Sequence, residues 1–208
     1  MTQTSPHSPP MPPAEALIHP ADLYARRRAR LAAQLGPGGI ALLPTATERP
    51  RNRDNDHAYR HDSYFYYLSG FAEPNAWLVI TAEGHTTLFC QPKDATREIW
   101  DGIRLGPQAA PMALGVDAAL PVSELASQLP KLLENRQTVW TPFATHAGLE
   151  TQLEGWLQQV RARVRFGALC PDTQRDLCSL LDEMRLVKDA HELDTMRRAA
   201  QISAQAHV

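Results

Sequence analysis

Four short apolar runs, separated by stretches with helical patterns, constrain the fold of this chain more than any other feature. They are residues 40–43, 76–81, 86–90 and 138–140. Runs of this length are typical of buried strands, and Glu83-Gly84 indicates an antiparallel hairpin between the second and the third. Because strands and helices alternate along the chain, the sequence predicts a layered α/β domain.

The predicted helices have recognisable starts and stops. The first opens at residues 19–22 (HPAD) and ends at the breaker cluster of residues 36–39 (GPGG). Ser123 is expected to cap a helix that runs through Leu133. Residues 148–160 carry apolar side chains on one face, which is the pattern of an amphipathic helix.

The last segment predicts a helix with a strong start and no stop. Asp189 and Glu192 have the spacing of a capping box, and helix is expected from Ala190 onward. No Gly, Asn or Pro closes this helix before Val208, so the natural chain is expected to continue beyond it. A frayed terminal helix in a complete protein is the alternative.

Composition indicates a folded domain and argues against one class of partner. Hydrophobic residues make up 43% of the 208 residues and charged residues 21%, close to the averages for soluble globular proteins. The net charge of -2 provides no basic field to attract a phosphate backbone, so nucleic acid is not an expected partner. The densest basic run, Arg26, Arg27, Arg28 and Arg30, is interpreted as a solvated helix face.

The termini and the cysteines bear on location. Residues 1–13 are rich in proline and predict a disordered tail without the order of a signal peptide. No run approaches the ~18 apolar residues of a membrane span, so no membrane partner is expected. Cys90, Cys170 and Cys178 are odd in number and are interpreted as free thiols in a reducing compartment. We therefore expect a cytoplasmic protein.

A search for chemistry from the residues alone yields no catalytic residue and no metal ligand. The sequence lacks an H-E-x-x-H pair, a G-x-S-x-G elbow and a phosphate-binding glycine loop. His57 and His61, flanked by Asp54, Asp56 and Asp62, are the best local cluster, but they lie in a polar stretch that is predicted to be a loop. A spacing of four residues carries little meaning there.

Three stretches resemble one family closely. They are residues 59–71 (YRHDSYFYYLSGF) with 73–76 (EPNA), residues 98–106 (EIWDGIRLG) with 115–117 (GVD), and residues 183–188 (EMRLVK) with 192–193 and 197–200. In this order they resemble the N-terminal domain of bacterial aminopeptidase P and the junction to its catalytic domain. Prolidase shares the first stretch, whereas the segment from Ile99-Trp100 to Gly106 favours aminopeptidase P.

The resemblance implies a fold and an activity. Residues 14–185 would form an α/β domain with a mixed β-sheet flanked by helices, and residues 186–208 would be the first helix of a pita-bread catalytic domain. Family members are Xaa-Pro aminopeptidases, which hydrolyse the bond before proline with two divalent metal ions, usually Mn²⁺. Their ligands, two Asp, one His and two Glu, all lie beyond the junction, so this chain alone is expected to be non-catalytic and to bind none of the metal.

The resemblance also implies partners. In such enzymes the N-terminal domain contacts its own catalytic domain, helps to assemble homo-oligomers and covers part of an active site that binds proline-containing peptides. Trp100 and Asp54 match positions on the substrate rim. The alternatives are a packed tryptophan for Trp100 and a solvated loop carboxylate for Asp54.

Two further functions remain open at this stage. One is a prolidase, which a dipeptide and a longer Xaa-Pro peptide would distinguish. The other is a free-standing module that binds peptides or assembles subunits without catalysis. The downstream coding sequence decides between a module and part of an enzyme.

Overall fold

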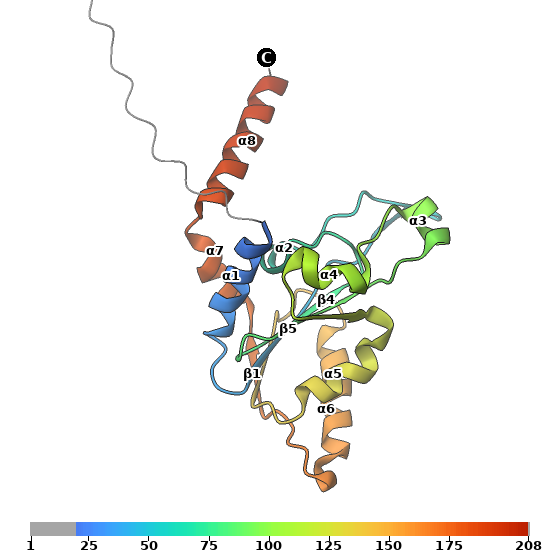
Figure 1. Cartoon of the computed structure of the whole chain (residues 1–208), viewed down its shortest axis with the longest axis vertical. Helices are drawn as coiled ribbons and strands as arrows, with labels where there is room; N and C mark the ends of the chain where they lie inside the picture. Colours follow the sequence, from blue (N-terminus) through green and yellow to red (C-terminus); the bar gives the residue numbers. More distant parts are fainter. Residues whose placement is uncertain (1–19, 208) are drawn as a thin grey trace, which may run out of the picture.

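A mixed six-stranded sheet forms the centre of the computed structural model, which describes residues 20–207 (Figure 1). The predicted tail of residues 1–13 lies outside the described residues. The strands follow the order β6-β5-β4-β1-β7-β8, where β6 is Ala118–Pro121, β5 Thr86–Cys90, β4 Trp77–Thr81, β1 Gly39–Pro44, β7 Thr138–Thr141 and β8 Thr173–Asp176. Strand β4 pairs antiparallel with β1 and β5, whereas β6 and β7 pair parallel with β5 and β1, and β8 pairs parallel with β7. The α/β class with a mixed sheet is therefore confirmed.

Helices cover both faces of this sheet. They are α1 Pro20–Ala32, α2 Ser63–Ser69, α3 Ala95–Asp101, α4 Gly106–Leu114, α5 Leu125–Leu133, α6 Leu149–Ala162, α7 Cys178–Leu186 and α8 Ala190–Ala206. Side chains alternate along β1, so Ala41 and Leu43 join the core beneath α1, α2 and α7, whereas Ile40 and Leu42 join the core beneath α5 and α6. Every residue of β1 is buried, as its apolar sequence predicts.

The four strands and the helices expected from the sequence are present, with one correction. A short 3₁₀ turn, Val122–Glu124, leads directly into α5, and the N-cap residue Glu124 makes no side-chain cap. Ser123 therefore lies inside the first turn and does not cap the helix. Its predicted role is wrong because a capping residue needs the extended backbone that precedes a helix.

The basic run on α1 is a second correction. Arg26 and Arg30 are exposed, but Arg27 and Arg28 are buried. Arg28, only 3% exposed, donates to the carbonyl of Leu68 at 3.0 Å and to the carbonyls of Leu114, at 3.1 Å, and Gly115. These carbonyls belong to the last turns of α2 and α4, so one guanidinium caps two helix C-termini. Burial lowers the pKa of Arg28 to about 10, which leaves it charged at neutral pH.

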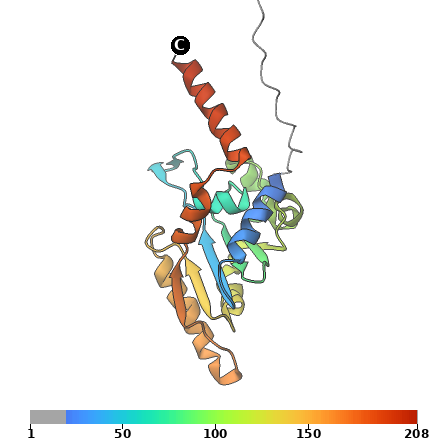
Figure 2. The same cartoon turned by 90° about the vertical axis from the view of Figure 1, so that its left-hand side faces the viewer.

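Helix α8 leaves the sheet domain and projects beyond it (Figures 1 and 2). It has the predicted capping box at Asp189 and Glu192, yet none of its residues is buried. Because packing supplies most of the stability of helices in proteins, α8 beyond its first turn is held by little besides its own backbone bonds. Among residues 20–207, every helix falls short of the length and apolarity that crossing a bilayer requires.

We predict rapid hydrogen exchange in α8. Amides from Thr195 onward should exchange much faster than those of β4, in which four of the five residues are buried. Exchange measured by mass spectrometry or NMR on a monomeric sample tests this. Protection of these amides equal to that of β4 would contradict the prediction.

Candidate functional site

The first family-like stretch acts as a structural support for the loop that precedes α2. The hydroxyl of Tyr59 lies 2.9 Å from Oγ1 of Thr45 and donates to the carbonyl of Ala46 at 3.1 Å. Asp62 caps α2 by accepting from the amide of Phe65 at 2.9 Å. Burial raises the pKa of Tyr59, so its hydroxyl stays protonated and can keep donating. These contacts hold the two ends of the polar stretch before α2, at Thr45 and at Asp62.

The end of α2 requires glycine. Gly70 adopts a left-handed φ of 66° and caps the helix through its amide. A Cβ at this position would lie 2.3 Å from a ring atom of Tyr24, which packs across the turn from α1. The pattern YLSGF is thus explained by local geometry rather than by chemistry.

Glu73 joins this support to the segment that carries Trp100. Its Oε1 accepts from the amide of Leu105 at 2.7 Å, at the N-cap position of α4 where no side-chain cap is present. Burial raises the pKa of Glu73, although its bond to Leu105 opposes the shift. The carboxylate therefore tethers the end of the α3 segment to the domain.

Polar bonds, rather than a core, hold α3 itself. Asp94 caps the helix by accepting from the amides of Thr96 at 3.0 Å and Arg97 at 3.1 Å. Asp101 pairs with Arg104 at 2.9 Å across the C-terminal end. No residue of α3 is buried, and Figure 1 shows the helix at the end of two extended stretches of chain, away from the sheet. Such a helix is free to present its side chains to another surface.

Three large apolar side chains on and just after α3 are exposed. Ile99 is 78% exposed, Trp100 85% and Ile103 84%. Exposed apolar clusters of this kind mark interaction sites in soluble proteins. Within this chain Trp100 is not a packed core residue, so the alternative considered for it from the sequence is wrong.

Asp54 lies on a separate projection, at the turn between β2 Pro50–Asn52 and β3 Asn55–Asp56. It is exposed. A polar hollow of about 290 Å³ is lined by Asp56 of this hairpin, by Arg97 and Asp101 of α3 and by Arg104 just after α3. The fold thus brings the segments of Asp54 and Trp100 to one hollow, although neither of the two residues lines it.

The histidine pair remains in the irregular segment that the sequence predicts. His57 is exposed, whereas the ring of His61 stacks on Tyr66 with centroids 4.1 Å apart. Burial lowers the pKa of His61. Within residues 20–207 no group of three or more His, Cys, Asp or Glu side chains is placed so that it could hold a metal ion.

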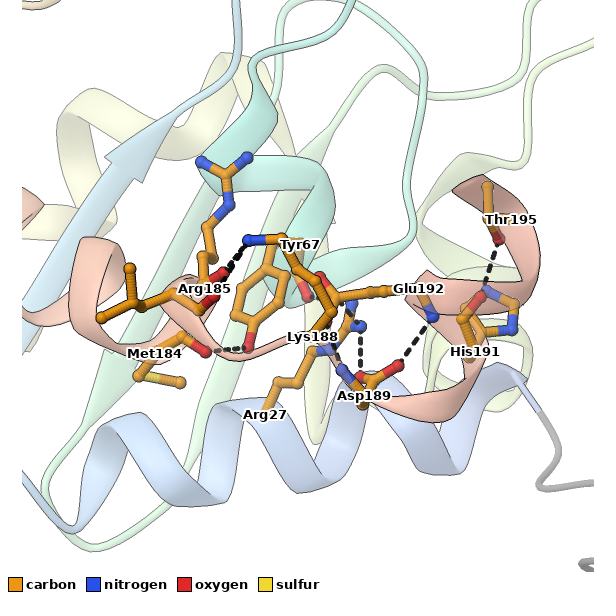
Figure 3. Close-up of polar contacts among 10 residues, drawn as sticks. Arg27, Tyr67, Met184, Arg185, Lys188, Asp189, His191, Glu192 and Thr195 are labelled. Atoms are coloured by element: carbon orange, nitrogen blue, oxygen red, sulfur yellow. Dashed lines mark hydrogen bonds and ion pairs between the residues drawn. The ribbon is translucent and has the colours of Figure 1, made fainter. Parts of the chain in front are cut away.

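A polar junction joins α1, α2 and α7 to the start of α8 (Figure 3). The hydroxyl of Tyr67 donates to the carbonyl of Met184 at 3.0 Å and so holds the end of α7. Arg27 of α1 donates to Oδ2 of Asp189 at 2.7 Å and lies 3.7 Å from Oε1 of Glu192. The sequence predicts the capping box but not this partner, because arginine is rarely buried and the whole run was therefore interpreted as a solvated face.

The charge of Asp189 is stabilised at this junction. Burial alone would raise the pKa of Asp189, but the hydrogen bonds from Arg27 and from the amide of Glu192 hold it below the usual value. The carboxylate is therefore ionised at neutral pH and both of its oxygens are in use.

Residues 20–207 thus form an α/β domain with three outward features, which are the exposed apolar helix α3, the β2–β3 hairpin and the helix α8 that leaves the domain. Residues 24–140 match the family model described as "Aminopeptidase P, N-terminal domain". The chain belongs to this family.

Curated relatives and solved structures agree with this assignment. The chain is 39% identical over 188 residues to the Xaa-Pro aminopeptidase of Escherichia coli K12, covering 88% of this chain and 43% of the relative. It is 34% identical to the Xaa-Pro aminopeptidase of Haemophilus influenzae, with 91% and 42% covered. The structure of Pseudomonas aeruginosa aminopeptidase PepP superimposes with a TM-score of 0.87 at 40% identity, covering 92% of this chain and 44% of that one. The chain therefore spans less than half the length of these relatives.

Proposed function

We propose that this chain serves as the N-terminal, non-catalytic part of a metal-dependent Xaa-Pro aminopeptidase, which removes the residue before a proline from the N-terminus of peptides. The observation that carries the proposal is the match of 88% of the chain to 43% of the Escherichia coli Xaa-Pro aminopeptidase. In this proposal residues 14–185 form the N-terminal domain and residues 186–208 are the first helix of a catalytic domain.

In this proposal the metal ions are bound by the catalytic domain and not by this chain. The described residues offer no cluster that could hold a metal ion, so they do not fit the two divalent ions, usually Mn²⁺, of the family. No step of the hydrolysis is assigned to residues of this chain. Its contribution would be to position the catalytic domain, to help assemble the oligomer and to cover part of the active site.

The covering role falls to the α3 segment and the neighbouring hairpin. We propose that Trp100, with Asp54 nearby, forms a rim that contacts peptide substrate at an active site, often that of a neighbouring subunit in a cytoplasmic homo-oligomer. The high exposure of Trp100 and its flanking isoleucines supports this role, since an apolar cluster gains stability only when another surface covers it.

Hydrolysis assays on two purified proteins test the proposal. A protein that extends this chain to the length of its relatives should cleave Xaa-Pro-Xaa peptides before proline, and a chelator should abolish the activity. The 208-residue chain alone should be inactive and should retain little Mn²⁺ after dialysis. Chelator-sensitive hydrolysis by the 208-residue chain would show that the catalytic groups have been placed in the wrong part of the protein.

Substrate length separates the alternatives. Activity confined to Xaa-Pro dipeptides would indicate a prolidase, whereas activity on longer peptides supports an aminopeptidase P. A reading frame that stops directly after Val208 would instead favour a free-standing module for peptide binding or assembly.

A further inference from the structure

The direction of α8 depends on contacts at its first turn. Only Val187, Lys188 and Asp189 separate α7 from α8, and none of the residues of α8 is buried. The preceding helix is anchored independently, because Leu181 and Met184 of α7 lie in the core. The orientation of α8 therefore requires a separate explanation.

Among residues 20–207, Arg27 supplies both ion pairs that join α8 and its cap to the domain. Its Nη2 lies 2.7 Å from Oδ2 of Asp189 and 3.7 Å from Oε1 of Glu192. Its Nη1 donates to the carbonyl of Tyr67 at 3.2 Å, and the guanidinium lies 4.1 Å from the centroid of the Tyr67 ring. A second ring, that of Tyr24, is 5.6 Å away. Contacts with Tyr67 and Tyr24 therefore hold the guanidinium in place independently of its ion pairs with α8.

The two carboxylates that Arg27 contacts also start α8. Oδ1 of Asp189 accepts from the amide of Glu192 at 2.8 Å, and Oε2 of Glu192 accepts from the amide of Asp189 at 3.0 Å. Each carboxylate therefore uses one oxygen for the capping box and turns the other toward Arg27 (Figure 3). A guanidinium held on one side and a capping box on the other leave the first turn little freedom to rotate.

We infer that Arg27 is a positioning residue that fixes the direction in which α8 leaves the N-terminal domain. The inference deepens the proposed function and rests on it for its consequence: if α8 begins the catalytic domain, Arg27 sets where that domain lies relative to the segment bearing Trp100. Arg27 would then act on substrate through α8, without touching it.

Distances between two spin labels measure this directly in the 208-residue chain. Labels at exposed cysteines replacing Gln159 on α6 and Asp194 near the start of α8, before the part that is predicted to exchange rapidly, report the angle of α8 against the domain. Cys170 and Cys178 are changed to serine, whereas Cys90 is fully buried and stays unlabelled. The unsubstituted junction should give one narrow distribution of distances.

Arg27→Met should broaden this distribution about twofold, because α8 then samples several directions. Arg27→Lys keeps the charge without the planar fork and should recover part of the narrow distribution. Arg26→Met, an exposed neighbour on the same helix, should change nothing. A folded Arg27→Met chain with the original narrow distribution would overturn the inference.

A second variant covers the case in which Arg27→Met fails to fold. Asp189→Asn with Glu192→Gln keeps both hydrogen bonds of the capping box and removes both negative charges. This variant should retain the helix content of the parent and broaden the distances. An unchanged distribution would again refute the role of Arg27.

The longer enzyme adds a kinetic measurement. Arg27→Met should raise KM for a tetrapeptide roughly three- to tenfold while kcat stays within about twofold, since a displaced rim weakens binding of the substrate more than the chemistry. A fall in kcat with unchanged KM would contradict a positioning role. If the longer enzyme lacks Xaa-Pro hydrolysis altogether, the proposed function fails, and the label distances alone decide the role of Arg27.

Discussion

Replacing Arg28 with methionine should lower the free energy of unfolding of the chain by about 3–5 kcal/mol, one of the two largest effects we expect. The guanidinium is buried and donates to three carbonyls, those of Leu68, Leu114 and Gly115. Methionine has a similar length but donates nothing, so these carbonyls would remain in the interior without their charged partner. The negative ends of α2 and α4 would also lose a compensating cation.

Chemical denaturation followed by circular dichroism measures this loss. Arg26→Met is the matched control, because Arg26 is exposed on the same helix, and its effect should stay within about 0.5 kcal/mol. If the two variants were equally stable, Arg28 would not stabilise the ends of α2 and α4.

The second large effect concerns activity rather than stability. In the longer enzyme, Trp100→Ala should reduce kcat/KM for long Xaa-Pro peptides roughly ten- to hundredfold, which corresponds to about 1–3 kcal/mol of lost contact with an aromatic face. Short substrates that do not reach the rim should be affected little. Because Trp100 is 85% exposed in this chain, its removal should change the stability of the isolated domain by no more than about 0.5 kcal/mol.

Two measurements test this prediction together. One is thermal melting of the 208-residue chain, and the other is kinetics on the longer enzyme. Met112→Ala is a suitable control, since Met112 is 91% exposed on α4 and outside the α3 segment. A large drop in melting temperature with equal losses for every substrate would show that Trp100 supports the fold instead of the rim.

The central strands were predictable because burial on both faces selects continuous apolar runs. The two edge strands, β6 and β8, could not be predicted in this way. Strand β8 consists of Thr173, Gln174, Arg175 and Asp176, with its two middle residues exposed, so no apolar pattern identifies it. Strand β6 is only half-buried and ends in Pro121. Their pairing with neighbours far along the chain, rather than local preference, makes them strands.

Part of the candidate site was likewise predictable from the sequence, and part was not. Family resemblance indicated Trp100, and its exposure on α3 fits a surface role, but that role depends on a surface outside the chain. Arg27 and Arg28 lie four and three residues before the buried Leu31, on the same face of α1, but they were assigned to solvent because arginine is rarely buried without a partner. Their burial follows from the packing of α1 against α2 and α4, which contribute the receiving carbonyls only in the folded state.

The two-sided burial of β1 has a consequence for synthesis on the ribosome. By Cys90 the chain contains β4 and β5 beside β1, together with α1 and α2, which cover part of one face of this sheet before α7 completes that core. The other face, with Ile40, Leu42 and Val79, is covered by α5 and α6, which end only at Ala162. At about 5–20 residues per second the intervening chain takes roughly 4–14 s to make. During that interval this apolar sheet face lacks its covering helices, so we expect chaperones that bind near the exit tunnel to associate with the nascent chain.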